Sequence, residues 1–172
     1  MASNKLVSAI FNSRAAAEGA VDAILRNSYG RDEISVVMSD STRAQHFALE
    51  TGTQAAQGAG VGGAVGGTVG AVVAALIAVG SNLVIPGIGL VIAGPIAAAL
   101  AGLGAGAAAG GLVGALVGAG IPEHRAKIYE AGLKSGGILI GVHAKSDKDA
   151  DMLERILAGF GGEGVKKERL GT

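Results

Sequence analysis

The chain contains no cysteine and no tryptophan, and aromatic residues make up only 3% of its 172 residues. The absence of cysteine excludes disulfide frameworks, thiolate nucleophiles and zinc–thiolate sites. The scarcity of aromatic rings disfavours base-stacking surfaces, and a net charge of zero provides no long-range field for a polyanion. We therefore expect no nucleic-acid partner.

The sequence also lacks the motifs that position nucleophiles, phosphates or metal ions. It has no G-x-S-x-G, no G-x-x-x-x-G-K-[ST] and no H-E-x-x-H. Gly58, Gly60 and Gly63 match G-x-G-x-x-G, but no strand directly precedes them and no acidic residue follows at the ribose-binding distance. The acidic run from Asp147 to Glu154 is explained as the charged start of a helix. We expect no enzyme activity, no cofactor, no metal site and no small-molecule substrate.

Glycine is abundant, with 31 residues, and it is unevenly distributed. From Thr51 to Ile121 there is no acidic or basic residue, and 20 of the glycines lie in this stretch. All 28 acidic and basic residues lie outside it. This partition indicates two physical environments within one chain.

The residues before the uncharged stretch predict a βαβ unit. Lys5–Phe11 alternates like a strand, and Ser13 is placed to cap a helix over Arg14–Asn27. Gly30 ends this helix, and Glu33–Ser39 reads as a second, more buried strand. A βαβ unit implies a right-handed parallel crossover.

After the uncharged stretch the alternation resumes. Pro122 suits the start of a helix that ends at Gly136 and Gly137. Ile138–Ala144 predicts a strand, and Ser146 is placed to cap a helix over Asp147–Phe160. A short edge strand is expected at Gly164–Glu168.

These elements predict an α+β fold: a ferredoxin-like βαβ…αβα(β) module that is interrupted by a glycine-zipper helical hairpin. We divide the chain into residues 1–50, the first half of the module with a linker helix, residues 51–121, the uncharged hairpin, and residues 122–172, the second half. The module alone would have roughly 100 residues, enough for a modest core.

Two apolar runs make up the expected hairpin, about Gly58–Gly80 and Ile88–Gly118. The segment between them contains Asn82, Pro86 and Gly87, which suit a reversal of the chain. As a helix the first run would span ~33 Å, close to the ~30 Å of a bilayer core. Pro95 in the second run favours a kink or a late helix start.

A four-residue glycine step marks both runs: Gly58, Gly62, Gly66 and Gly70 in the first, and Gly102, Gly106, Gly110, Gly114 and Gly118 in the second. Glycines at this spacing lie on one helix face and allow a second helix to approach closely. In water each interior glycine disfavours a helix by ~1 kcal/mol relative to alanine, so packing or lipid must offset the loss.

The sequence resembles a family of bacterial general-stress proteins, akin to heat-induced stress proteins, that carry a glycine-zipper insertion. The matching segments are Ala16–Val21, Ile34–Val37, the glycine run, Gly120–Glu123, Tyr129–Gly132 and Gly136–Ala144. The resemblance implies a bacterial origin and a stress-linked, non-catalytic role. It supplies no catalytic residues.

Two functional hypotheses remain open. In the first, the hairpin inserts in or associates with the bacterial inner membrane and drives oligomerisation, with both flanks in the cytoplasm as an interaction module; Met1–Phe11 lacks the apolar core of a signal peptide. In the second, the protein is a soluble cytoplasmic homo-oligomer, a shell or cage whose hairpins are buried in its core. Under both hypotheses the protein is its own partner, and the first adds the lipid membrane.

Overall fold

The computed structural model describes residues 5–39, 41–42, 83–85, 90–97, 111–118 and 120–169. Its strands are β1 (Lys5–Phe11), β2 (Ile34–Ser39), β3 (Leu83–Ile85), β4 (Leu90–Ala93), β5 (Ile138–Ala144) and β6 (Glu163–Arg169). Its helices are α1 (Arg14–Arg26), the short 3-10 helix η1 (Arg31–Glu33), α7 (Gly111–Gly118), α8 (Glu123–Lys134) and α9 (Asp147–Gly159). The fold is therefore α+β, as the sequence predicts.

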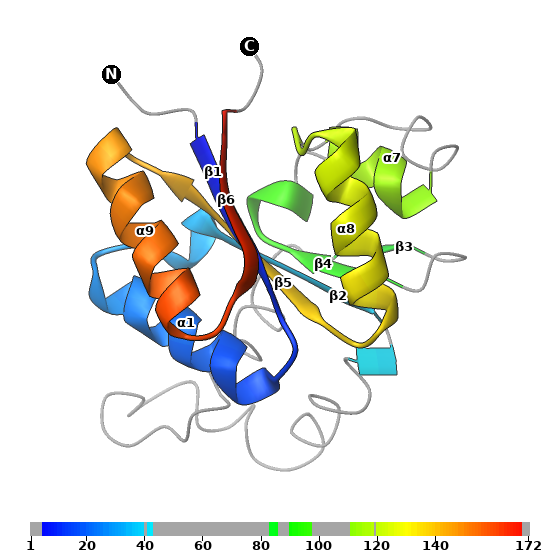
Figure 1. Ribbon diagram of the computed structural model, residues 1–172, viewed down its shortest axis with the longest axis horizontal. Coiled ribbons are helices and arrows are strands. Elements are labelled where there is room, and N and C mark those ends of the chain that lie inside the picture. The colour runs from blue at the N-terminus through cyan, green and yellow to red at the C-terminus, as the bar shows by residue number, and fades with distance from the viewer. Residues whose placement is uncertain are drawn as a thin grey trace.

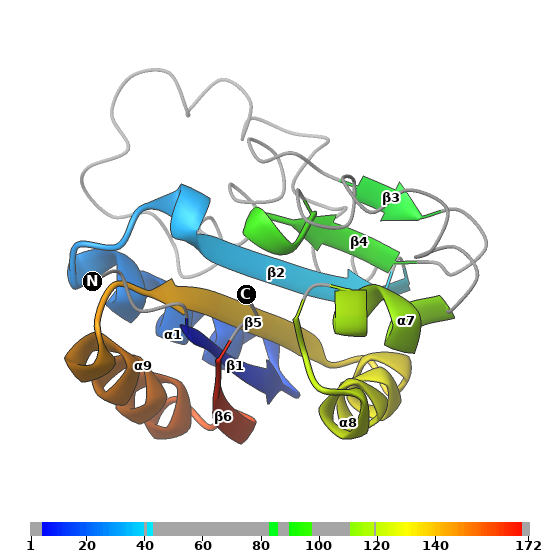
Figure 2. The same cartoon turned by 90° about the horizontal axis from the view of Figure 1, so that it is seen from above.

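The strands form one antiparallel sheet in the order β3-β4-β2-β5-β1-β6 (Figure 2). In register, Phe11 of β1 pairs with Ile138 of β5, and Met38 of β2 pairs with the same Ile138. Because β1 and β2 are both antiparallel to β5, they run parallel to each other. The expected parallel βαβ arrangement is thus present, but β5 lies between its two strands.

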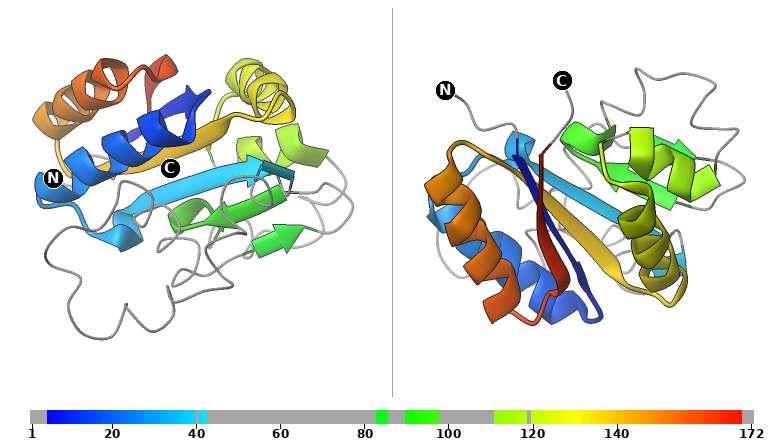
Figure 3. Two further views of the ribbon diagram at one scale, coloured as in Figure 1. Left: turned by 90° about the horizontal axis from the view of Figure 1, so that it is seen from below. Right: turned by 45° about the horizontal axis from the view of Figure 1, so that its top comes forward.

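Helices cover both faces of the sheet (Figure 1). Alternate residues of each central strand point to opposite faces, so the strands contribute to two apolar clusters. The first cluster lies under α1 and α9 and includes Val7, Phe11 and Ile140. The second includes Leu6, Leu139 and Tyr129 of α8. Figure 3 shows the two helical layers from below and from an inclined view.

The predicted caps form as expected. The Ser13 hydroxyl accepts a hydrogen bond from the Ala16 amide at 3.1 Å, and the Ser146 hydroxyl accepts one from the Asp149 amide at 3.1 Å. The helices that they begin, α1 and α9, each end one residue earlier than predicted. β5 has the predicted bounds, and the expected short edge strand is the longer β6.

Part of the uncharged stretch packs onto the module. Leu83–Ile85 forms β3 and Leu90–Ala93 forms β4, which pairs with β2. The expectation of a helix from about Ile88 is therefore wrong for these residues, because a short apolar run fits a buried strand as well as a helix. The late helix start that Pro95 allowed is confirmed, since residues 95–97 are helical.

Side chains of this stretch belong to the second apolar cluster, including Ile92, Ile96 and Leu116. The antiparallel pairing of β3 with β4 reverses the chain between Ile85 and Leu90. The predicted turn residues Asn82, Pro86 and Gly87 lie outside the described residues, as does the first run, Gly58–Gly80. The division of the chain at residues 50 and 121 stays a prediction.

Candidate functional site

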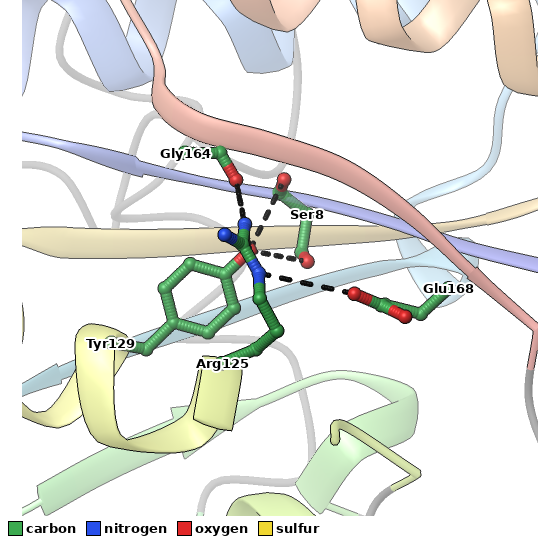
Figure 4. Close-up of polar contacts among 5 residues, drawn as sticks. All are labelled: Ser8, Arg125, Tyr129, Gly164 and Glu168. Atoms are coloured by element: carbon green, nitrogen blue, oxygen red, sulfur yellow. Dashed lines mark hydrogen bonds and ion pairs between the residues drawn. The ribbon is translucent and has the colours of Figure 1, made fainter. Parts of the chain in front are cut away.

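A group of buried polar side chains lies where α8 meets β1 and β6. Arg125 and Tyr129 are one turn apart on the inner face of α8, and both side chains point toward the strands (Figure 4). We call Ser8, Arg125, Tyr129, Gly164 and Glu168 the Arg125 cluster. It joins residues that are up to 160 positions apart in the chain, from Ser8 to Glu168.

The Tyr129 hydroxyl is the centre of the Arg125 cluster. It lies 2.9 Å from the Ser8 hydroxyl, and both residues are fully buried. The carbonyl oxygens of Gly164, at 3.3 Å, and Ser8, at 3.5 Å, are further acceptors around it. A buried tyrosine is expected to satisfy its hydroxyl in this way, because an unpartnered polar group inside a protein is costly.

Arg125 brings a positive charge into this interior, with the residue only 8% exposed. Its Nη2 donates to the Gly164 carbonyl and to the Tyr129 hydroxyl, the latter at 3.2 Å. Its Nε lies 3.8 Å from Oε1 of Glu168, and its guanidinium carbon lies 5.2 Å from the centre of the Tyr129 ring. The Nε is buried without a hydrogen-bond partner among the described atoms, so Glu168 compensates the charge without a direct hydrogen bond to it.

A bulge in β6 brings the Gly164 carbonyl to Arg125. The pairing of β1 with β6 shifts register between Ser8 and Ile10, and Gly164 has φ +61°. Glycine adopts this left-handed conformation without the steric penalty of a side chain. The described contacts of the Ser8 and Tyr129 hydroxyls are with each other, with Arg125 and with backbone carbonyls, so the Arg125 cluster ties α8 to β1 and β6.

The acidic side chains of α9 form ion pairs with lysine side chains of β1 and β6. Asp151 and Glu154 lie 2.6 Å and 2.8 Å from Nζ of Lys167 on β6. Asp147 lies 2.8 Å from Nζ of Lys5. Within the described ranges no group of three metal-binding side chains occurs.

His143 on β5 differs from an ordinary surface histidine. It is half-buried, and its Nδ1 has no hydrogen-bond partner in the described part of the chain. Burial lowers the pKa of His143 from its ordinary 6.5, and the nearby Glu33 carboxylate partly opposes this shift. His143 is thus only partly accessible, whereas His124 on α8 is exposed.

This burial predicts a pH dependence of stability. The folded state favours the neutral form of His143, so the free energy of unfolding is not reduced by this residue above pH ~6.5. As the pH falls from ~6.5 toward the lowered pKa of the folded state, protonation of His143 favours the unfolded state and the free energy of unfolding decreases. We expect the urea midpoint to decrease between pH 7 and pH 5, and His143→Gln to remove this His143-dependent part. His124→Gln, at an exposed position, should keep the wild-type slope. An unchanged slope in His143→Gln would contradict the assignment.

Some of the predicted helix-packing glycines lie among the described residues and others do not. Gly114 and Gly118 lie on α7, whereas the others, Gly58, Gly62, Gly66, Gly70, Gly102, Gly106 and Gly110, lie outside the described residues. Leu112, Ala115 and Leu116 of α7 are buried against the module. Gly118 is exposed, and no described atom lies within 4 Å of a Cβ placed on Gly114.

Sequence reasoning did not single out the Arg125 cluster. Tyr129 lies in one of the segments that carry the resemblance, and Arg125 lies in the helix predicted after Pro122. The only local signal is their four-residue spacing, which places them on one helix face. Their partners Ser8 and Glu168 lie at the two ends of the chain, beyond any local pattern.

Comparisons with family models, with curated proteins and with solved structures find no match for this chain. Among the described residues, no helix combines the length and the apolar character needed to cross a bilayer.

Proposed function

We propose that this protein is a non-catalytic, self-assembling protein in which a ferredoxin-like module presents glycine-bearing helices to other copies of the chain. The ferredoxin-like interpretation is supported by the order β6-β1-β5-β2 within the sheet. With α1 between β1 and β2, and α9 between β5 and β6, this is the split βαβ pattern repeated twice. The uncharged stretch is then an insertion between β2 and β5.

The observation that carries the proposal is the orientation of α7. Its apolar side chains Leu112 and Leu116 face the module, whereas Gly114 has no described neighbour at its Cβ position and Val117 is 42% exposed. A helix face with glycine and an exposed valine permits close approach by another helix. The same four-residue glycine step continues toward Gly102 in the sequence.

The membrane hypothesis is the second candidate. Residues 90–97 and 111–118 pack on the module, and thirteen residues, 98–110, lie between them. A helix of that length would span ~20 Å, less than the ~30 Å of a bilayer core. The first run, Gly58–Gly80, has the length to span, but a single crossing would place the paired strands β2 and β4 on opposite sides of the bilayer. A membrane-associated form at the inner membrane would therefore insert that run from one side without crossing. The stress-linked role implied by the resemblance applies to either form.

Gly114→Leu tests the proposal. We expect the wild-type protein to be a homo-oligomer without detergent, and the variant to have a lower mass by light scattering, because leucine blocks close helix approach at this face. Glycine disfavours a helix by ~1 kcal/mol, so the substitution should not lower the stability of α7 itself. Ala131→Leu adds the same side chain to an exposed position on α8 and should leave the mass unchanged.

Two results would contradict this proposal. A monomeric wild-type protein would exclude self-assembly. An unchanged mass for Gly114→Leu would exclude the α7 face as the contact between copies. Retention of the wild-type protein in membranes through an alkaline carbonate wash, with release by detergent only, would instead support the membrane-associated form.

A further inference from the structure

The C-terminal strand β6 is held to the module differently from the other long strands. It lies at one end of the sheet and, in the described part of the chain, pairs with β1 alone. None of its residues is buried, and only Val165 packs in part against an apolar cluster. By contrast, every residue of β1 from Leu6 to Phe11 is buried. An element with so little buried apolar surface belongs to the least stable part of a fold.

Polar side chains supply most of the other attachments of β6. Glu163 accepts a hydrogen bond from Nδ2 of Asn12 at 2.8 Å, and Lys167 forms its two ion pairs with α9. Arg125 binds the Gly164 carbonyl and faces Glu168. Each of these contacts joins a residue of β6 to a residue outside it, so the β6 strand of a second copy would restore all of them.

The site that β6 occupies is the edge of β1, and the residues around this edge match the sequence of β6. Without β6, the edge of β1 would expose the backbone of a seven-residue strand, five of whose side chains belong to the two apolar clusters. Such an edge readily pairs with another strand. A strand with the β6 sequence also places Glu168 beside Arg125 and Lys167 beside the acidic side chains of α9, so the occupant that fits is a second copy of this chain.

The connection before β6 is short. α9 ends at Gly159 and β6 begins at Glu163, and the Gly162 amide donates to the Leu157 carbonyl at 2.8 Å. Exchange would straighten this connection, and short hinge connections are where domain swapping occurs. We propose that β6 exchanges between copies, so that the β6 strand of one chain occupies the β1 edge of another. This contact is independent of the α7 face.

The absence of native cysteine allows a direct test by disulfide trapping. Lys5 lies directly opposite Arg169 on one side and Ala144 of β5 on the other, within the range that a disulfide can bridge. Two single-cysteine chains, Lys5→Cys and Arg169→Cys, are mixed in urea, refolded together at high concentration and oxidised. The readout is the mass of the disulfide-linked product under denaturing, non-reducing conditions.

A matched mixture of Lys5→Cys and Ala144→Cys is the control, because β5 is a central strand that cannot be exchanged without unfolding the module. We expect the Lys5/Arg169 mixture to give about tenfold more mixed disulfide than the control, since only the exchangeable strand brings its cysteine to another chain. Dilution during refolding should decrease the yield. The double variant Lys5→Cys/Arg169→Cys, refolded at low concentration, should form the disulfide within one chain, which would show that β6 pairs with β1.

Equal yields in the two mixtures, or no mixed disulfide while the dilute double variant closes, would overturn the exchange. Failure of the double variant to form the disulfide within one chain would overturn the exchange as well, because β6 would then not pair with β1. Repeating the mixture in the Gly114→Leu background separates this inference from the proposed self-assembly: the mixed disulfide should persist there even if the larger assembly is lost.

Discussion

Arg125→Met is expected to lower the free energy of unfolding by about 3 kcal/mol, because it leaves the partly buried Glu168 carboxylate without its cation. The Arg125 side chain is 10% exposed and that of Glu168 is 18% exposed, so water can only partly replace the lost interaction. The variant also removes the donors to the Gly164 carbonyl and the Tyr129 hydroxyl. Urea unfolding followed by circular dichroism measures the change.

Two further variants identify the cause of this loss. Lys127→Met removes a charge from the outer face of the same helix, where Lys127 pairs with Glu123 in solvent, and its midpoint should match that of the wild type. Arg125→Met/Glu168→Leu removes both charges and should recover much of the lost stability, because an apolar pair does not require compensation. A double variant as unstable as Arg125→Met would show that the hydrogen bonds of Arg125, rather than the stranded carboxylate, dominate.

The parts of the fold that were predicted correctly depend on local signals. Ser13 and Ser146 cap their helices through amides three residues away, and Ile138–Ala144 is a strand because it is apolar and lies between a glycine pair and a helix cap. Neighbouring residues determine these features. The outcome therefore depends little on the rest of the chain.

Other features depend on distant partners. No local pattern alone places β5 between β1 and β2, as the predicted ferredoxin-like module requires, since these pairings join residues 100 or more positions apart. The Ser8–Tyr129 hydrogen bond joins residues 121 positions apart. β4 was missed for another reason: Leu90–Ala93 lies in an apolar run whose uniform composition conceals the period that separates strand from helix. Its pairing with β2 decides its structure.

Leu116→Ala provides the strongest test of whether the uncharged stretch belongs to the module. Leu116 is fully buried in the same cluster as Ile96 and Tyr129. Truncating a buried leucine removes apolar contacts and leaves a cavity, so we expect the free energy of unfolding to decrease by about 3 kcal/mol. The measurement is urea unfolding at one fixed protein concentration, because a change of oligomeric state would also shift the midpoint.

The neighbouring residue provides the matched control. Val117 is 42% exposed on the same helix, and Val117→Ala should change stability by no more than about 0.5 kcal/mol. If Leu116→Ala were as mild as Val117→Ala, α7 would not pack on the module in solution, and residues 98–118 would again be available to span a membrane. A large loss for Leu116 alone would mean that the second glycine run is anchored at both ends to a folded core, so that its glycines can meet another helix only beside that core.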